Sequence, residues 1–297
     1  MTGKHNKKKI ERLFVIKQLA PITQYQDRGR FGHLDQGFSV SGAMDCTAFA
    51  INNRLLGNDD NAAQLEIAPG GLQLQCLADC TIAIAGAYAT PTLNGRPLIN
   101  ACAVQVKQGD NLHFGFAKVG QFCYLAVAGG FLPEPFLGSR STTRRLHVFP
   151  GGQALTVGSV LTGRAVVLDK LQGEKRKSLP DYRQQVLKVM PAFQCEDFSD
   201  EALTHFTSQT FSVEKSDRMG TRLSANRSAI DWQGGELLSE GLLAGAIQIP
   251  PDGNPIVLQK DAQSIGGYPK IGLLTKDSQA LLAQKKVGDT VRFAWMD

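Results

Sequence analysis

Residues 26–67 read Q-D-R-G-R-F-G (26–32), then S-G-A-M-D (41–45), L-L-G-N (55–58) and Q-L-E-I (64–67). The first segment is a polar loop, in which Gly29 and Gly32 permit turn geometry that residues with a Cβ resist. Apolar residues then recur at helical spacing at 48, 51 and 55, and Gly57-Asn58 is a stop signal. The stretch therefore predicts a short helix over 45–56 that follows a loop dense in Asp, Arg and Ser, where chemistry is often found.

Short apolar runs on both sides of this stretch predict strands. In the first half they occupy residues 13–21, 72–76, 81–87, 103–106, 112–116 and 124–128, with a hairpin signal at Asn94-Gly95. In the second half they include 186–190, 210–213 and the two runs that flank the turn P-P-D-G (250–253). The chain is therefore predicted to be mainly β with a few short helices, and closer to a barrel than to a βαβ sheet.

The two halves share two sequence features. Asp27-Arg28 recurs as Asp217-Arg218, and Gly109-Asp110 recurs at a similar offset as Gly288-Asp289. A duplicated β module would explain both, whereas two ordinary Gly-Asp turns and a chance Asp-Arg pair are the alternative. We expect a disordered basic tail at 1–10 and two domains at 11–175 and 182–297, joined by a polar linker near 171–181.

Composition excludes several classes of protein. Of 297 residues, 42% are apolar, which is enough for a sizeable core, and the net charge is +5. The basic clusters at 4–9 and 170–177 lack interleaved aromatic residues, so we predict no nucleic-acid partner. No apolar run reaches the roughly 18–20 residues of a membrane helix. Six cysteines without a C-x-x-C pattern predict free, buried thiols in a reducing, cytoplasmic compartment.

Familiar catalytic signatures are missing from the sequence. There is no G-x-x-x-x-G-K-[ST] phosphate loop, and F-S-V-S-G (38–42) resembles a nucleophile turn only superficially, because G-x-S-x-G would need Gly where Ser41 stands. The five histidines show no i, i+4 pairing, so no metal site is predicted. An M-K-M biotinyl-lysine motif is also absent, and any carboxyl carrier would belong to another chain.

The candidate catalytic residues are Asp217, Arg218 and Arg28. Each Asp-Arg pair could be a local ion pair that stiffens a turn. Alternatively, a guanidinium could face a carboxylate or carboxyphosphate-like group, which its planar fork binds at two points. Arg140, in G-S-R-S-T, is a second candidate for binding an anion.

Four further residues are candidates for binding a substrate. Ser41 is either a ligand contact or a cap of the 45–56 helix. Glu66 lies in an apolar strand and needs a partner if buried, for which Arg28 or Arg54 is the expected donor. Gln263 and Tyr268 could bind a substrate amide or ring, although Tyr268 could equally be a packed barrel plug.

As a set, several motifs resemble one protein family. Q-D-R-G-R-F-G, S-G-A-M-D, S-D-R-M-G (216–220), P-P-D-G and G-G-Y-P (266–269) are similar to the KipA / allophanate hydrolase subunit 2 family, which is biotin-dependent carboxyltransferase-like and includes the 5-oxoprolinase C subunits. The resemblance runs from about residue 16 to residue 293 and implies two cyclophilin-like β-barrel domains in tandem. Residues 149–162 lack the G-R-x-L…G-D common in members, and Thr221 stands where an aromatic residue is usual.

The resemblance also implies a function. It suggests a cytoplasmic C subunit of an ATP-dependent 5-oxoprolinase, inactive alone, which converts 5-oxo-L-proline to L-glutamate together with a KipI-like B subunit and a LamB/YcsF-like A subunit. ATP would be used by the complex, and direct contact with this chain is left open. One alternative is a KipA-like regulator that binds a KipI-type kinase inhibitor without chemistry. Another is the carboxyltransferase component of a biotin-dependent urea or amide carboxylase.

Overall fold

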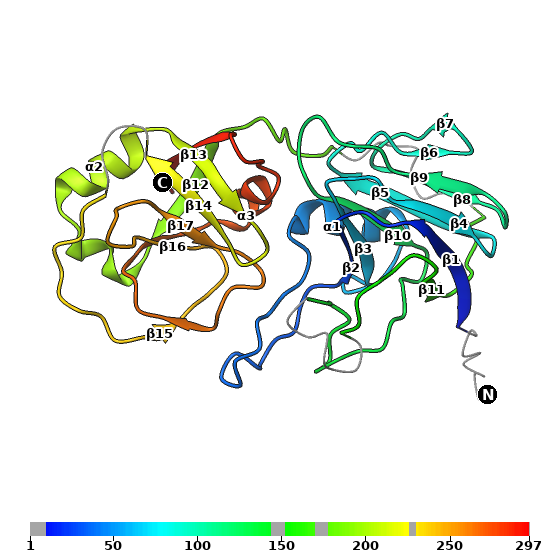
Figure 1. Ribbon diagram of the computed structural model, residues 1–297, viewed down its shortest axis with the longest axis horizontal. Helices are drawn as coiled ribbons and strands as arrows, with labels where there is room; N and C mark the ends of the chain where they lie inside the picture. Colours follow the sequence, from blue (N-terminus) through cyan, green and yellow to red (C-terminus); the bar gives the residue numbers. More distant parts are fainter. Residues whose placement is uncertain (1–9, 144–151, 170–177, 226–229, 297) are drawn as a thin grey trace. The chain divides into compact units, whose positions relative to one another are not determined.

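The computed structural model describes residues 10–143, 152–169, 178–225 and 230–296. They form two compact units (Figure 1). The first unit comprises the described residues of Met1–Arg28, Ala48–Lys118 and Cys123–Leu179, and the second those of Gly29–Thr47, Val119–Phe122 and Pro180–Asp297. The expected domains were continuous, whereas here two early segments, 29–47 and 119–122, belong to the second unit. Most of the expected tail at 1–10 and of the linker at 171–181 lies outside the described residues.

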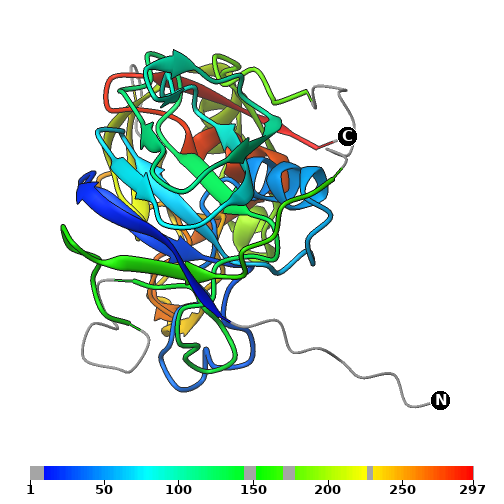
Figure 2. The same cartoon turned by 90° about the vertical axis from the view of Figure 1, so that its right-hand side faces the viewer.

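The first unit contains two antiparallel sheets. The six-stranded sheet has the order β11-β1-β4-β9-β6-β7 and comprises β1 (Glu11–Gln18), β4 (Gln73–Cys76), β6 (Thr92–Leu93), β7 (Arg96–Pro97), β9 (Asn111–His113) and β11 (Val160–Gly163). The five-stranded sheet has the order β2-β3-β10-β5-β8 and comprises β2 (Ile22–Gln26), β3 (Gln64–Ala68), β5 (Cys80–Gly86), β8 (Cys102–Val106) and β10 (Cys123–Val127). Figure 2 shows β1 beside β11, its antiparallel neighbour.

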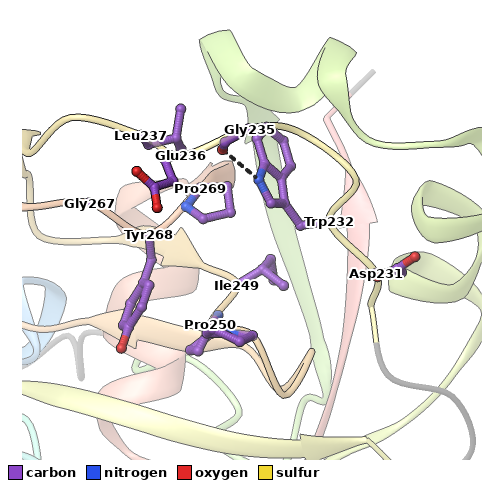
Figure 3. A pocket seen from close by; sticks show the side chains of 11 residues that line it. Asp231, Trp232, Gly235, Glu236, Leu237, Ile249, Pro250, Gly267, Tyr268 and Pro269 are labelled. Carbon is purple, nitrogen blue, oxygen red and sulfur yellow. Dashed lines mark hydrogen bonds between the residues drawn. The ribbon is translucent and has the colours of Figure 1, made fainter.

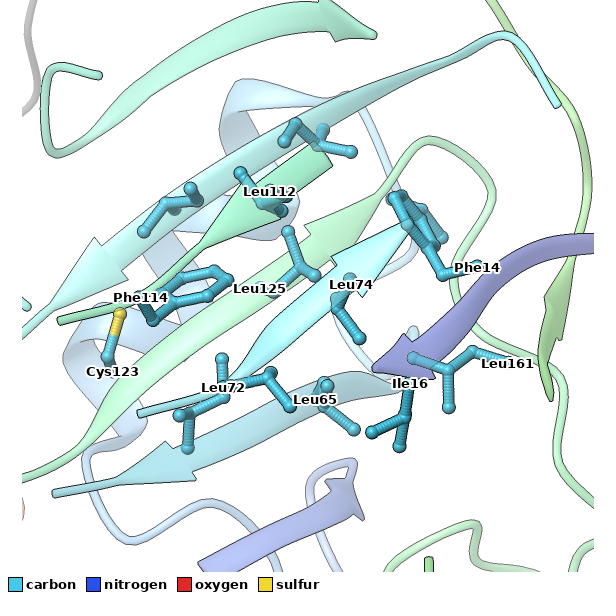
Figure 4. Packing of buried hydrophobic residues seen from close by; sticks show 14 of the residues in the cluster. Phe14, Ile16, Leu65, Leu72, Leu74, Leu112, Phe114, Cys123, Leu125 and Leu161 are labelled. Atoms are coloured by element: carbon cyan, nitrogen blue, oxygen red, sulfur yellow. The ribbon is translucent and has the colours of Figure 1, made fainter. Parts of the chain in front are cut away.

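Side chains from both sheets share one apolar core. Phe14, Leu74 and Leu112 come from the six-stranded sheet, and Leu65 and Leu125 from the five-stranded one (Figure 4). All five are essentially inaccessible to solvent. Burial of such side chains stabilises the fold by about 1.5–3 kcal/mol each, so the two sheets depend on one another for their stability.

Two local predictions in the first half are confirmed. Helix α1 spans Cys46–Leu55, and Gly57 follows it with a φ of 62°, the left-handed conformation that ends many helices. Asn94 and Gly95 join β6 to β7 with φ values of 50° and 78°. Positive φ at both central residues is what a two-residue type I′ hairpin turn requires.

The second unit contains a closed barrel with the order β12-β19-β16-β17-β14-β13-β20. Its strands are β12 (Val186–Pro191), β13 (Phe211–Ser216), β14 (Gly220–Ala225), β16 (Ala246–Gln248), β17 (Ile256–Leu258), β19 (Lys270–Leu274) and β20 (Thr290–Trp295). Among these neighbours, β12 and β20 run parallel and the other pairs are antiparallel. A separate two-stranded sheet pairs β15 (Glu240–Gly241) with β18 (Ile265–Gly266).

Two helices and a 3₁₀ segment of the second unit were not predicted. They are the 3₁₀ helix η2 (Phe193–Asp197), α2 (Asp200–Ser208) and α3 (Lys276–Ala283). The Ser199 side chain caps α2 by accepting from the Ala202 N–H, and Thr275 caps α3 by accepting from the Ser278 N–H. Ser or Thr before an acidic first turn was therefore the available signal.

The mainly β prediction is confirmed, with a closed barrel in the second unit. The first unit differs from the barrel that the resemblance implied, because its backbone hydrogen bonds link the strands into two sheets. In the described part of the chain, every helix is too short or too polar to cross a bilayer.

The two Gly-Asp turns have the same hydrogen bonds. In the first unit the Asp110 carboxylate accepts from the Lys107 N–H at 2.8 Å, and the Asp110 carbonyl accepts from a β4 N–H at 2.8 Å. In the second unit the Asp289 carboxylate accepts from the Lys286 N–H at 2.8 Å, and its carbonyl accepts from a β13 N–H at 2.8 Å. This local geometry is what a duplicated module predicts for the Gly-Asp anchor.

Candidate functional site

Arg218 lies in the turn between β13 and β14 and is only 8% exposed. Its Nε donates to Asp261 Oδ2 at 2.8 Å, and its Nη2 donates to Asp261 Oδ1 at 3.0 Å. The Arg218 carbonyl in turn accepts from the Asp261 N–H at 2.7 Å. The two residues are therefore joined through both side chains and backbone, and the guanidinium fork already holds a carboxylate of its own chain.

The same guanidinium binds the S-G-A-M-D segment within the second unit. Its Nη2 donates to the Gly42 carbonyl at 2.9 Å and to Ser41 Oγ at 3.2 Å. Ser41 also donates its N–H to the Lys260 carbonyl at 2.8 Å. Ser41 has a φ of 58°, an uncommon value for a residue with a Cβ, and is held there by these bonds.

Gly29 shows why the D-R-G segment needs glycine. Its φ is 107°, and a Cβ at this position would stand 2.7 Å from the Val40 carbonyl oxygen. The next residue, Arg30, donates its N–H to that same carbonyl at 2.7 Å. The backbone therefore folds back on itself at a distance that no side chain would allow.

Asp45 is a second anchor of this segment that sequence reasoning missed. It is fully buried, and its Oδ2 accepts from the Tyr182 hydroxyl and from Gln284 Nε2, both at 2.8 Å. Its Oδ1 accepts from the Thr47 N–H at 3.0 Å, so Asp45 caps α1. Ser41 is four residues too early for that role, and the cap interpretation of Ser41 is wrong.

Neither Asp-Arg pair is a local ion pair among the described residues. Asp217 is exposed, and its Oδ1 accepts from the N–H groups of Met219 and Gly220 at 2.7 and 3.1 Å, as in an Asx turn. Arg218 is committed to Asp261 instead. The tight turn directs the two neighbouring side chains to different surroundings.

Asp27, in the first unit, is buried and bound by a serine pair. Its Oδ1 accepts from the hydroxyls of Ser139 and Ser141 at 2.7 and 2.6 Å, and its Oδ2 accepts from the Arg140 N–H at 2.6 Å. Three donors to one carboxylate offset the cost of its burial. Arg28 is exposed and donates its backbone N–H to Asn61 Oδ1 at 2.9 Å.

Glu66, in β3, is fully buried. Its carboxylate accepts from the Tyr124 hydroxyl at 2.8 Å and from Gln24 Nε2 at 3.2 Å, so its partners include neutral side chains. The expected ion pair with Arg28 or Arg54 is not formed, because cross-strand neighbours supply donors inside the sheet.

The remaining candidates lie in the second unit. Gln263 is exposed, and Tyr268 is 46% exposed, so the barrel-plug interpretation of Tyr268 is wrong. Tyr268 lines a pocket with a volume of about 430 Å³ (Figure 3). The second unit therefore contains Ser41, Arg218 and Tyr268, whereas Arg28, Glu66 and Arg140 belong to the first.

Several cysteine thiols are buried, and the possible metal ligands of the described residues are not clustered. Burial raises the pKa of the Cys76, Cys80 and Cys123 thiols to about 12, as for inert structural cysteines. Within the described ranges, no three His, Cys, Asp or Glu side chains are grouped so that they could hold a metal ion.

Asp261 is the residue that the sequence concealed most completely. It stands 43 positions after its partner Arg218, and Arg218 stands 177 positions after Ser41. Asp261 lies three residues after β17, the strand that follows the P-P-D-G turn, and precedes G-G-Y-P. That position between two family motifs was the one available signal.

The sequence and the fold are those of a known domain family. The family model described as carboxyltransferase domain, subdomain A and B, matches residues 36–295, and the chain belongs to this family. It is 34% identical to the C subunit of 5-oxoprolinase from Haemophilus influenzae over 94% of this chain and 88% of that protein. For the corresponding C subunit from Escherichia coli the identity is 33%, over 95% of this chain and 90% of that protein.

In more distant relatives, the region that matches this chain is part of a larger protein. The urea amidolyase of Lachancea kluyveri is 28% identical over 94% of this chain but 17% of its own length. Among solved structures, TTHA0988 matches with a TM-score of 0.84 and 31% identity, over 95% of this chain and 55% of that one. The urea carboxylase of Kluyveromyces lactis also gives a TM-score of 0.84, at 25% identity, over 98% of this chain and 28% of its own.

Proposed function

We propose that this chain is the C subunit of an ATP-dependent 5-oxoprolinase that converts 5-oxo-L-proline to L-glutamate. The observation that carries the proposal is the similarity to two 5-oxoprolinase C subunits over 94–95% of this chain and 88–90% of those proteins. Within such a complex, the chain would act in the cytoplasm with a KipI-like and a LamB/YcsF-like protein. ATP is assigned to the assembled complex, in keeping with the missing phosphate-loop motif.

The geometry supports different roles for the two arginines. Arg28 is exposed and has no side-chain partner among the described residues, so its guanidinium can meet a substrate carboxylate. Arg218 is committed to Asp261, to the Ser41 hydroxyl and to the Gly42 carbonyl. We therefore assign Arg218 as a positioning residue that fixes the segment carrying Ser41, and Arg28 as the anion contact.

Carboxyl transfer to urea or another amide is the second candidate function. The family's description as a carboxyltransferase domain and the similarity to a urea amidolyase favour it. The carboxyl group would arrive on a biotin carrier of another chain, since this sequence lacks a biotinyl-lysine motif.

One reconstitution separates these functions. The chain is co-expressed with KipI-like and LamB/YcsF-like partners, and L-glutamate is measured from 5-oxo-L-proline and ATP with and without it. Glutamate that forms only with all three chains establishes the proposal. Undiminished activity without this chain rejects it, and the absence of glutamate in every combination favours the carboxyl-transfer function, which biotin-dependent carboxylation of urea then tests.

A further inference from the structure

The second unit contains a pocket that the proposed function does not use. It lies among residues 231–237, 249–251 and 267–269 and has a volume of about 430 Å³. Small-molecule pockets commonly enclose about 300–1,000 Å³. The space is therefore large enough for a compact ligand of several non-hydrogen atoms.

Two aromatic rings and rigid apolar groups form its walls. Figure 3 shows Trp232 and Tyr268 around the space that is also lined by Ile249, Pro250 and Pro269. Two contacts hold the Trp232 indole, because its Nε1 donates to the Gly235 carbonyl at 3.4 Å and its ring packs on Phe198 with centroids 4.8 Å apart. One aromatic wall is thus fixed in place without a ligand.

The charges at the pocket are all of one sign. Asp231 and Glu236 are among the eleven lining residues, which include no Lys, Arg or His, although the whole chain carries a net charge of +5. The Asp231 carboxylate accepts from Gln233 Nε2 at 3.2 Å. The Glu236 carboxylate is exposed and makes no hydrogen bond or ion pair with any described residue, so it can bind a ligand.

These features select a particular kind of ligand. The face of an aromatic ring attracts a cation through its quadrupole, most strongly for Trp. A nearby carboxylate adds a negative charge that attracts the same cation. Proline and isoleucine walls favour an apolar body over a fully hydrated ion. We propose that this pocket binds a small molecule that carries an ammonium or guanidinium group on a short apolar body. This proposal does not depend on the 5-oxoprolinase assignment.

The chain offers its own reporter for a binding test. It contains two tryptophans, Trp232 and Trp295, so Trp295→Phe leaves Trp232 as the sole indole fluorophore. Choline is the probe, and its neutral isostere 3,3-dimethyl-1-butanol is the control for shape and apolar contact. We expect a saturable change in Trp232 fluorescence with choline, and about tenfold weaker binding of the alcohol, which corresponds to about 1.4 kcal/mol.

A pair of charge variants tests the role of Glu236. Glu236→Gln is expected to weaken choline binding about fivefold and to leave binding of the alcohol unchanged. Glu11→Gln, the control, removes an exposed carboxylate from β1 in the first unit and should leave the binding of both choline and the alcohol unchanged. Calorimetric titration of the unmodified chain with both probes gives the same comparison if Trp295→Phe does not fold. Equal affinity for choline and the alcohol, or no saturable signal with choline, overturns the proposal.

Discussion

Arg218 and Asp261 form a buried ion pair through two hydrogen bonds, with Nε–Oδ2 and Nη2–Oδ1 distances of 2.8 and 3.0 Å. Four residues further on, Arg222 forms the exposed counterpart, with Glu214 at 3.1 Å and with Asp252. The two arginines come from the same hairpin but differ in solvent exposure, 9% against 36% for the side chains. This difference makes them a matched pair for measuring what burial does to an ion pair.

Arg218→Ala should lower the free energy of unfolding by about 3–5 kcal/mol, because Asp261 is left buried without its counter-charge. Arg222→Ala should cost less than about 1 kcal/mol, since its partners remain solvated. Urea denaturation followed by tryptophan fluorescence suits this test, because both tryptophans lie in the second unit. Equal losses from the two variants would contradict the structural assignment.

Tyr124→Phe should destabilise the first unit by about 1–3 kcal/mol, because the buried Glu66 carboxylate loses its 2.8 Å donor. Tyr88→Phe is the control, as the Tyr88 hydroxyl reaches the Leu98 carbonyl at 3.3 Å from a side chain that is 45% exposed. Scanning calorimetry of both variants gives the comparison. A larger loss from Tyr88→Phe would show that the Glu66 contact is unimportant.

Three thiols should resist labelling in the folded chain. Burial raises the pKa of the Cys76, Cys80 and Cys123 thiols to about 12. At pH 8 about one such thiol in ten thousand is a thiolate even before access is considered. Mass spectrometry after brief alkylation should find them unmodified, with faster labelling at the half-buried Cys46 and Cys102. Labelling in urea is the control, where all six should react alike.

Lys285 should make stability depend on pH. It is 3% exposed, its Nζ donates to the Tyr182 carbonyl at 2.8 Å, and desolvation lowers its pKa from the ordinary 10.5. The native state then releases this proton at a lower pH than the unfolded state. Between the lowered pKa and 10.5 the unfolded chain binds more protons, so the Lys285 contribution to stability rises with pH.

The measurement for Lys285 is the difference in unfolding free energy between the unmodified chain and Lys285→Met at several alkaline pH values. Subtracting the two unfolding free energies cancels the contributions of groups that titrate equally in both proteins. The difference should be flat at neutral pH and should shift in favour of the unmodified chain as the pH rises. A shift in the opposite direction would mean that the Lys285 pKa is raised by folding.

Arg28→Ala should separate function from stability. Because the side chain is exposed, we expect a change in unfolding free energy within about 0.5 kcal/mol. In the reconstituted oxoprolinase, loss of a charged contact to substrate should lower kcat/KM about tenfold to a hundredfold. Arg54→Ala is the control. It removes a different exposed arginine, which lies in α1, and should leave kcat/KM unchanged. Unchanged kcat/KM in Arg28→Ala would remove Arg28 from the proposed site.

Features that depend on neighbours in the chain were readable from the sequence. The spacing of apolar residues placed α1, Asn94-Gly95 placed the β6–β7 hairpin, and the Gly-Asp pairs marked two turns with the same hydrogen bonds. These structures are set by backbone conformation and by contacts within a few residues. The caps at Ser199 and Thr275 belong to the same class, although the helices that follow them were not predicted.

The tertiary structure alone decided which partner each polar side chain has. Asp27 and Arg218 each belong to the same two-letter motif, yet Asp27 is bound by Ser139 and Ser141, and Arg218 by Asp261. Segment 29–47 joins the second unit because its buried polar groups find their hydrogen bonds there. A buried charge must be paired, but the sequence records only its presence, whereas the fold of distant strands determines which donor or acceptor reaches it.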